Sequence, residues 1–256
     1  MGKETVVGQC RLCHFERELR CSHIIPEFLY KPLYDSKGRI FAVSTSDQTR
    51  LPFKIEQKGL REYLLCQSCE TQLSRYEGVA RTLFESGQLK VKGEPGVEVA
   101  GLDYLKLRLF FLSILWRSSV STLPFFREVT LGPHEAKLRE MILEEKPGKP
   151  WQYGCALSDL ADKFEEHRLV IIQPVSSRAD GQRHYFYVLG GFLWHYIVSS
   201  HRPEGAFLRL LLTQEGRMTV TATNPERIPF LVELRRRLNE QGKLEKLIER
   251  YGEEEA

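Results

Sequence analysis

Four of the six cysteines form two pairs with the same spacing, Cys10-Arg11-Leu12-Cys13 and Cys66-Gln67-Ser68-Cys69. Each C-x2-C pair can place two thiolates on one tetrahedral ion at about 2.3 Å, and the repeated spacing argues against chance. The sequence therefore predicts a zinc site with ligands Cys10, Cys13, Cys66 and Cys69. Because four protein ligands leave no open coordination position, we expect the zinc ion to be structural.

Two other interpretations of the cysteines are weaker. A compact finger made of Cys10, Cys13, Cys21 and His23 would leave Cys66 and Cys69 unexplained. Simple burial of small side chains would leave the repeated spacing unexplained. We interpret Cys21 and Cys155 as packed thiols, and we expect no disulfides because a chain of 256 residues in a reducing compartment does not need them.

A histidine motif lies between the two cysteine pairs, and an acidic residue follows the second pair. The two segments read Leu19-Arg20-Cys21-Ser22-His23-Ile24-Ile25-Pro26 and Tyr63-Leu64-Leu65-Cys66-Gln67-Ser68-Cys69-Glu70. Over about residues 10–84 the chain resembles the HNH, or ββα-metal, endonucleases, which are built on a treble-clef zinc scaffold. The resemblance implies a module that acts on nucleic acid, of the kind fused to varied partners in restriction, mobile-element and anti-phage systems.

The resemblance also implies roles for individual residues. His23 takes the position of the general base that deprotonates water, a role that suits the imidazole because its ordinary pKa lies near neutrality. A catalytic Mg²⁺ or Mn²⁺ ion is expected between Ser22 and the helix that carries Glu70 and Ser74. Glu70 is the expected ligand, since carboxylate oxygens suit these ions. Glu77 lies seven residues further on the same helical face and could also contribute.

The chain departs from the family pattern at two places. Ser22 is a poor metal ligand beside the aspartate or histidine that the family has there. The stretch from Leu51 to Leu65 contains no asparagine to orient the base, and Gln57 is its only amide. Two hypotheses are therefore kept. The first is a zinc-stabilised, metal-dependent endonuclease with catalytic residues His23 and Glu70, and the second is a catalytically inactive zinc-binding adaptor. DNA, RNA or a protein is the expected partner.

Composition bounds these hypotheses. The 37 basic and 34 acidic residues give a net charge of only +3, so any contact with nucleic acid must be local. The N-terminus lacks the pattern of a secretory signal, and no window reaches the length of a membrane span. We therefore expect a cytoplasmic protein without membrane contact. Neither a dinucleotide fingerprint nor a Walker motif is present.

The expected fold class is α+β, with a treble-clef module in residues 1–92 and an α+β domain of unassigned role in residues 101–256. The Gly and Pro content of residues 91–96 marks the boundary. An antiparallel β-meander and a C-terminal helix are expected after a helical segment. His184, His195 and His201 are interpreted as ordinary residues of this sheet. The patterns predict strands at 39–44, 51–55, 169–173, 184–189, 192–199, 206–213 and 217–223, and helices at 69–84, 102–119, 134–145, 158–167 and 227–251.

Overall fold

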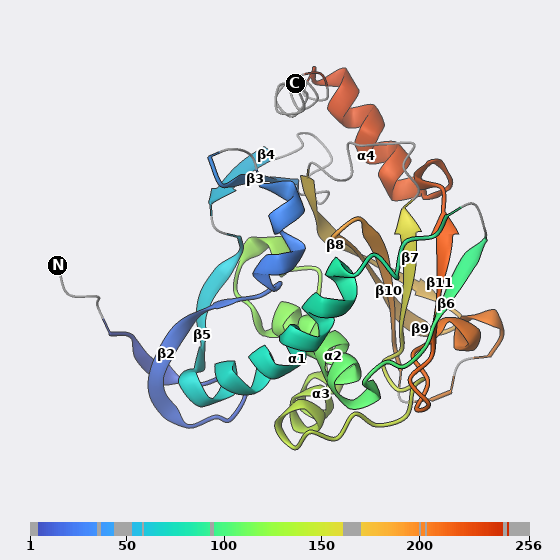
Figure 1. Ribbon diagram of the computed structural model, residues 1–256. Helices are drawn as coiled ribbons and strands as arrows, with labels where there is room; N and C mark the ends of the chain where they lie inside the picture. Colours follow the sequence, from blue (N-terminus) through green and yellow to red (C-terminus); the bar gives the residue numbers. More distant parts are fainter. Residues whose placement is uncertain are drawn as a thin grey trace.

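The computed structural model describes residues 5–34, 37–43, 53–57, 59–92, 95–160, 170–199, 201–202, 204–242 and 245. This part of the chain is an α+β fold with two sheets (Figure 1). The smaller sheet has the order β1-β2-β5 and consists of the antiparallel strands β1 (Val7–Gln9), β2 (Glu16–His23) and β5 (Arg61–Cys66). Helix α1 (Gln67–Glu85) begins directly after β5 and packs on β2 and β5, so these three elements form a ββα unit.

The larger sheet has eight strands in the order β4-β3-β8-β9-β10-β7-β11-β6. Strands β8, β9 and β10 follow one another in antiparallel pairing, as the expected meander requires. The sheet as a whole is mixed, however, because β3 pairs with β8 and β11 pairs with β7 in parallel. The strands are β3 (Arg39–Val43), β4 (Phe53–Gln57), β6 (Gly96–Val99), β7 (Cys155–Leu160), β8 (Val170–Ala179), β9 (Gln182–Leu189), β10 (Phe192–Val198) and β11 (Met218–Thr223).

Two tight turns set the register of the meander. Asp180 and Gly181 connect β8 to β9 with φ angles of 52° and 73°, and Gly190 and Gly191 connect β9 to β10 with φ angles of 60° and 80°. Positive φ at both central residues matches the twist of the flanking strands and favours glycine, asparagine and aspartate. The Asp-Gly and Gly-Gly pairs in the sequence therefore suit these two turns.

Three helices lie between the two sheets (Figure 1). Helix α2 (Tyr104–Val120) is apolar around most of its circumference, and its start is capped by Asp103, whose side chain accepts a hydrogen bond from the Lys106 amide at 3.0 Å. Helix α3 (His134–Leu143) packs on α2. The core joins both parts of the chain, since Phe84 of α1 stacks on Trp194 of β10 with ring centroids 5.3 Å apart. In the described ranges, no helix has the length and apolar content needed to cross a membrane.

Two of the predicted elements are wrong. Residues 155–160 form strand β7 rather than the start of a helix at 158–167, and the rest of that predicted helix lies outside the described residues. This strand is buried on both faces between β10 and β11, so it lacks the alternation that marks an exposed strand. Residues 206–210 form a 3-10 helix instead of a strand, after Gly205 with φ of 86°.

The C-terminal helix covers the opposite face of the large sheet. Helix α4 (Pro229–Glu240) buries Leu231, Leu234 and Leu238 in a second apolar cluster that includes Val188 of the sheet. The helix starts later than predicted because Asn224 caps a short 3-10 turn at residues 225–227, and Pro229 then opens the α-helix. The predicted part from residue 246 to 251 lies outside the described residues.

A pair of histidines lies on this second face. His184 Nδ1 and His195 Nε2 are 2.8 Å apart across β9 and β10, and Phe186 and Phe207 pack on the His195 ring at centroid distances of 4.5 and 4.9 Å. Burial, followed by the neighbouring His184, lowers the pKa of His195 to about 4. Both histidines are sheet residues, as expected, but the sequence did not predict that they pair.

The His195 pKa makes stability depend on pH. Because the folded chain holds this imidazole neutral down to about pH 4, while an unfolded chain takes up a proton near pH 6.5, stability is present above pH 6.5 and is lost as the pH falls toward 4. We expect a loss of about 2–3 kcal/mol over this window, measured by urea unfolding at several pH values. His195→Gln should flatten that dependence, whereas His201→Gln at an exposed position should not. An unchanged slope in His195→Gln would exclude this origin.

Candidate metal centre and the polar cluster beside it

The four predicted cysteines meet at one point of the ββα unit. Cys10 and Cys13 flank the turn between β1 and β2, Cys66 ends β5, and Cys69 lies in the first turn of α1. All four Sγ atoms lie within 4.8 Å of one another, and Cys13 Sγ is 3.8 Å from Cys66 Sγ. Four sulfur atoms at about 2.3 Å from a central zinc ion form a tetrahedron with edges of about 3.8 Å. The size and chemistry of this donor set therefore fit zinc.

The surroundings of the cluster shift the pKa values of its thiols in opposite directions. A hydrogen bond with Cys69, assisted by backbone N–H groups that include Cys66 N at 3.3 Å, lowers the pKa of Cys10 to about 4 despite its burial. The hydrogen bond with Cys10 raises the pKa of Cys69 in turn. Such crowding of sulfur atoms is relieved when a cation replaces the shared proton. The thiols of Cys10, Cys66 and Cys69 are buried and that of Cys13 is partly buried, as a structural ion requires.

The other cysteines lie elsewhere. Cys21 is exposed on β2, and Cys155 is buried in β7, where burial raises the pKa of its thiol to about 12. Throughout the described ranges, the four paired cysteines are the only group of three or more His, Cys, Asp or Glu side chains close enough to share an ion. The compact finger that would use Cys21 and His23 is therefore not formed. Cys21 was also expected to be packed, and its exposure corrects that interpretation.

A bulge in β5, opposite Arg20 and Cys21 of β2, determines where Ser22 and His23 lie. The pairing of β2 with β5 shifts register between Arg20 and Cys21, after which His23 pairs with Arg61. Ser22 is 2% exposed, and its hydroxyl accepts a hydrogen bond from the Leu65 amide at 3.3 Å and lies 3.2 Å from the Arg20 carbonyl oxygen. Ser22 therefore fastens β2 to β5, while His23 at the end of the strand is only partly buried.

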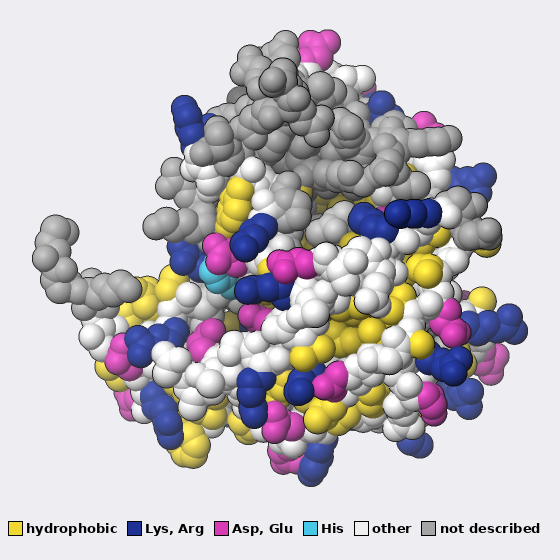
Figure 2. Space-filling model, viewed as in Figure 1, with side chains coloured by type: hydrophobic (Ala, Val, Ile, Leu, Met, Phe, Trp, Pro, Cys, Tyr) yellow, Lys and Arg dark blue, Asp and Glu magenta, His cyan; other side chains and the backbone are white. Residues whose placement is uncertain are grey.

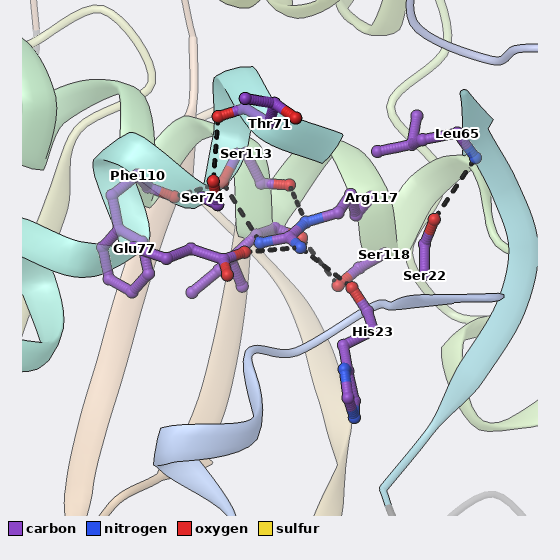
Figure 3. Close-up of polar contacts among 11 residues, drawn as sticks. Ser22, His23, Leu65, Thr71, Ser74, Glu77, Phe110, Ser113, Arg117 and Ser118 are labelled. Atoms are coloured by element: carbon purple, nitrogen blue, oxygen red, sulfur yellow. Dashed lines mark hydrogen bonds and ion pairs between the residues drawn. The ribbon is translucent and has the colours of Figure 1, made fainter. Parts of the chain in front are cut away.

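Arg117 of α2 forms a hydrogen bond to the end of β2. Its Nη1 donates to the backbone carbonyl of His23 at 2.9 Å and forms an ion pair with Glu77 at 2.8 Å. The Arg117 side chain is 2% exposed, and the Ser113 hydroxyl lies 3.4 Å from its Nη2. Figure 3 shows that the His23 imidazole points away from this guanidinium. Arg117 thus links β2, α1 and α2 and fixes the backbone that carries His23.

Glu70, in the first turn of α1, lies near the Arg117 guanidinium. Burial raises the pKa of its carboxyl group, and the Ser22 hydroxyl and the Arg117 charge act against that rise. One of its oxygens, Oε1, is buried and has no hydrogen-bond partner among the described residues. The structure therefore brings Ser22, Glu70, Glu77 and Arg117 together beside His23.

The side chains of this polar cluster do not form a preorganised set of ligands for Mg²⁺ or Mn²⁺. A divalent ion needs several oxygen ligands, but Glu77 is neutralised by Arg117 and Ser22 is held by backbone groups. The guanidinium already supplies positive charge beside both glutamates. The expected catalytic ion therefore has no formed ligand set in the described residues, and we assign no chemical step to it.

Arg117 is the residue of this cluster that sequence reasoning missed. The two arginines within the largely apolar helix α2, Arg108 and Arg117, are the signal that could have drawn attention to it, because a buried guanidinium requires a partner. Its partners lie at positions 23 and 77, too distant in sequence to be recognised without the fold.

The surface around the cluster carries charges of both signs. Figure 2 shows acidic and basic side chains gathered around a histidine side chain on the face above α1. Mixed charge on this face agrees with the small net charge of the chain and gives no broad positive field.

Comparisons with protein-family models, curated proteins and solved structures found no match to this chain.

Proposed function

We propose that this chain is a zinc-stabilised, HNH-like protein that hydrolyses phosphodiesters in nucleic acid. One observation carries the proposal: His23 ends β2 beside a cluster formed by Glu70 and Glu77 of α1 and Arg117 of α2, next to the four-cysteine group. These groups come from three elements, and Arg117 holds the backbone of the histidine itself. A general base, carboxylates and a fixed cation are the kinds of group that phosphodiester hydrolysis uses.

In this proposal the zinc ion is part of the scaffold. The turn of Cys10 and Cys13 and the helix start of Cys66 and Cys69 correspond to the two halves of a treble clef, with one Zn²⁺ between them. Four thiolates complete its coordination, so the ion supplies rigidity and no site for substrate. Zinc binding would fix β2 against α1, and hence His23 relative to Glu70.

The proposed chemistry is the addition of water across a phosphodiester bond. The neutral imidazole of His23 takes one proton from a water molecule as the water oxygen bonds to phosphorus. The bond between phosphorus and the leaving oxygen breaks, and that oxygen takes a proton from solvent. His23 then returns its proton to solvent. Arg117 positions His23 through its backbone carbonyl, and its charge offsets that of Glu77, with which it forms an ion pair.

Cleavage assays on several nucleic acids test this proposal. Purified chain is incubated with supercoiled DNA, single-stranded DNA and RNA, each with Mg²⁺, with Mn²⁺ and without an added divalent ion. Nicking or cutting of at least one substrate is expected. If every substrate remains intact under all three conditions, the enzyme proposal is refuted.

The second candidate, a zinc-binding adaptor without catalysis, is favoured by a different observation. The Ser22 hydroxyl is used by backbone groups, and Glu77 is held in an ion pair with a buried arginine. These contacts are the ones that a purely structural cluster would make. The adaptor predicts binding to a protein or nucleic acid without cleavage, so the same assays separate the two.

Arg139 of α3 is expected to support the zinc site. Its Nη1 donates to the Leu12 carbonyl at 2.7 Å, inside the turn between Cys10 and Cys13. Partners that orient the ligands of a metal typically change its affinity by about 10–100-fold. We expect Arg139→Ala to weaken zinc binding about tenfold in competition with a chromogenic chelator. Lys137→Ala, on an exposed face of the same helix, is the control, and equal zinc affinity in both variants would contradict the role of Arg139.

A further inference from the structure

Two adjoining hollows lie between the β8–β9 hairpin and the segment that leads into α3. Their volumes are about 370 Å³ and about 420 Å³, and both are lined by Thr130, Arg178 and Arg183. Arg127 and Glu128 line the second hollow, together with the exposed side chains of Ser176 and Ser177. We call the face formed by Arg127, Arg178 and Arg183 the arginine surface.

In the part of the chain that the structure describes, the lining of the two hollows carries more positive than negative charge. Arg178 and Arg183 lie directly opposite each other in the β8–β9 ladder, an arrangement that is unfavourable for like charges. Among the described residues, Glu128 is the only acidic side chain that lines either hollow, and it lies 3.6 Å from Arg127. Arg178 has no ion pair or side-chain hydrogen bond with any residue that the structure describes. An anion between the two strands would relieve this repulsion.

The geometry is suited to phosphate in particular. Arg183 Nη1 is held in place by the Thr130 carbonyl oxygen at 2.8 Å and the Thr130 hydroxyl at 2.7 Å, both neutral partners. These neutral partners therefore fix the position of the Arg183 guanidinium without compensating its positive charge. Arginine forks bind phosphate oxygens in pairs, and serine hydroxyls such as those of Ser176 and Ser177 can add further donors.

We propose that the arginine surface binds phosphate groups and that these belong to the backbone of a nucleic acid. The class of ligand rests on the proposed function, whereas the site lies on different elements from His23 and does not use it. Within a chain of small net charge, this surface provides the local phosphate contact that nucleic-acid binding requires.

Binding is tested by fluorescence anisotropy with labelled single-stranded DNA, double-stranded DNA and RNA. All chains carry His23→Ala so that the probes stay intact. Arg178→Gln is the principal variant because it removes no described bond, and Arg209→Gln removes an exposed arginine elsewhere as the control. We expect Arg178→Gln to weaken binding about tenfold. The double variant Arg178→Gln/Arg183→Gln should also reduce the slope of log affinity against log salt by about 1.8 on duplex DNA.

Inorganic phosphate, compared with chloride at equal ionic strength, distinguishes the two sources of the ligand. If inorganic phosphate displaces the labelled probe and chloride does not, the site binds a single phosphate group. If only unlabelled oligonucleotides displace the probe, the surface recognises the nucleic-acid backbone. Equal affinities of Arg178→Gln and Arg209→Gln, or no binding of any probe or of phosphate, would overturn the inference. A chain that binds through this surface but cuts nothing would refute only the proposed hydrolysis.

Discussion

Cys66→Ser is expected to release the zinc ion and unfold the ββα unit. The substitution removes one of four thiolates that join the turn of Cys10 and Cys13 to the start of α1. A structural zinc ion contributes about 10–16 kcal/mol to the folding of small zinc domains, so loss of the ion is costlier than an ordinary core substitution. We expect no bound zinc on metal analysis, and a loss of at least about 5 kcal/mol of stability in urea unfolding.

Cys21→Ser provides the matched control for this prediction. Cys21 is exposed on β2 and lies outside the four-cysteine group, so its replacement by serine should leave both zinc content and stability unchanged. The pair of variants separates the loss of a metal ligand from the loss of any thiol. If Cys66→Ser kept one zinc ion and unfolded like the native chain, the proposed coordination would be wrong.

His23→Ala is expected to reduce cleavage by about 10²–10⁴-fold, the contribution that a positioned general base typically makes. The zinc content should not change, because the imidazole does not belong to the metal group and points away from Arg117. The rate constant for nicking of supercoiled DNA is the measurement, with circular dichroism to show that the chain is folded. The variant should also lose the fall in rate at low pH that protonation of a general base produces.

His201→Ala is the control for the histidine prediction. His201 is exposed and follows the meander, so its removal should leave the cleavage rate unchanged. Equal rates for the native chain and His23→Ala would show that His23 is not the base. In that case the ββα unit would be a scaffold whose histidine is structural.

Local patterns in the sequence predict much of the ββα unit and its four-cysteine group. The two C-x2-C pairs identify the four clustered cysteines because each pair needs only a single turn of chain to bring two sulfur atoms together. Helices α1, α2 and α3 and the turns at Asp180 and Gly190 likewise follow from short stretches of sequence. These features are determined by neighbouring residues, so no knowledge of the fold is required.

Other features depend on pairing across long distances in the chain. Strands β3 and β4 precede the second cysteine pair, yet β3 pairs in parallel with β8 of the large sheet. The ion pair of Arg117 with Glu77 and the pairing of His184 with His195 require α1, α2 and the strands to be placed first. A central strand such as β7 has no alternating pattern, so nothing in its second half argues against the helix predicted at 158–167.

Zinc K-edge X-ray absorption on the purified native chain, combined with metal analysis, tests the central claim most directly. The claim is that Cys10, Cys13, Cys66 and Cys69 hold one zinc ion that fixes His23 beside α1. We expect one zinc ion per chain with four sulfur neighbours at about 2.3 Å. A chain that folds without zinc, or a zinc ion with nitrogen or oxygen atoms among its nearest neighbours, would contradict it.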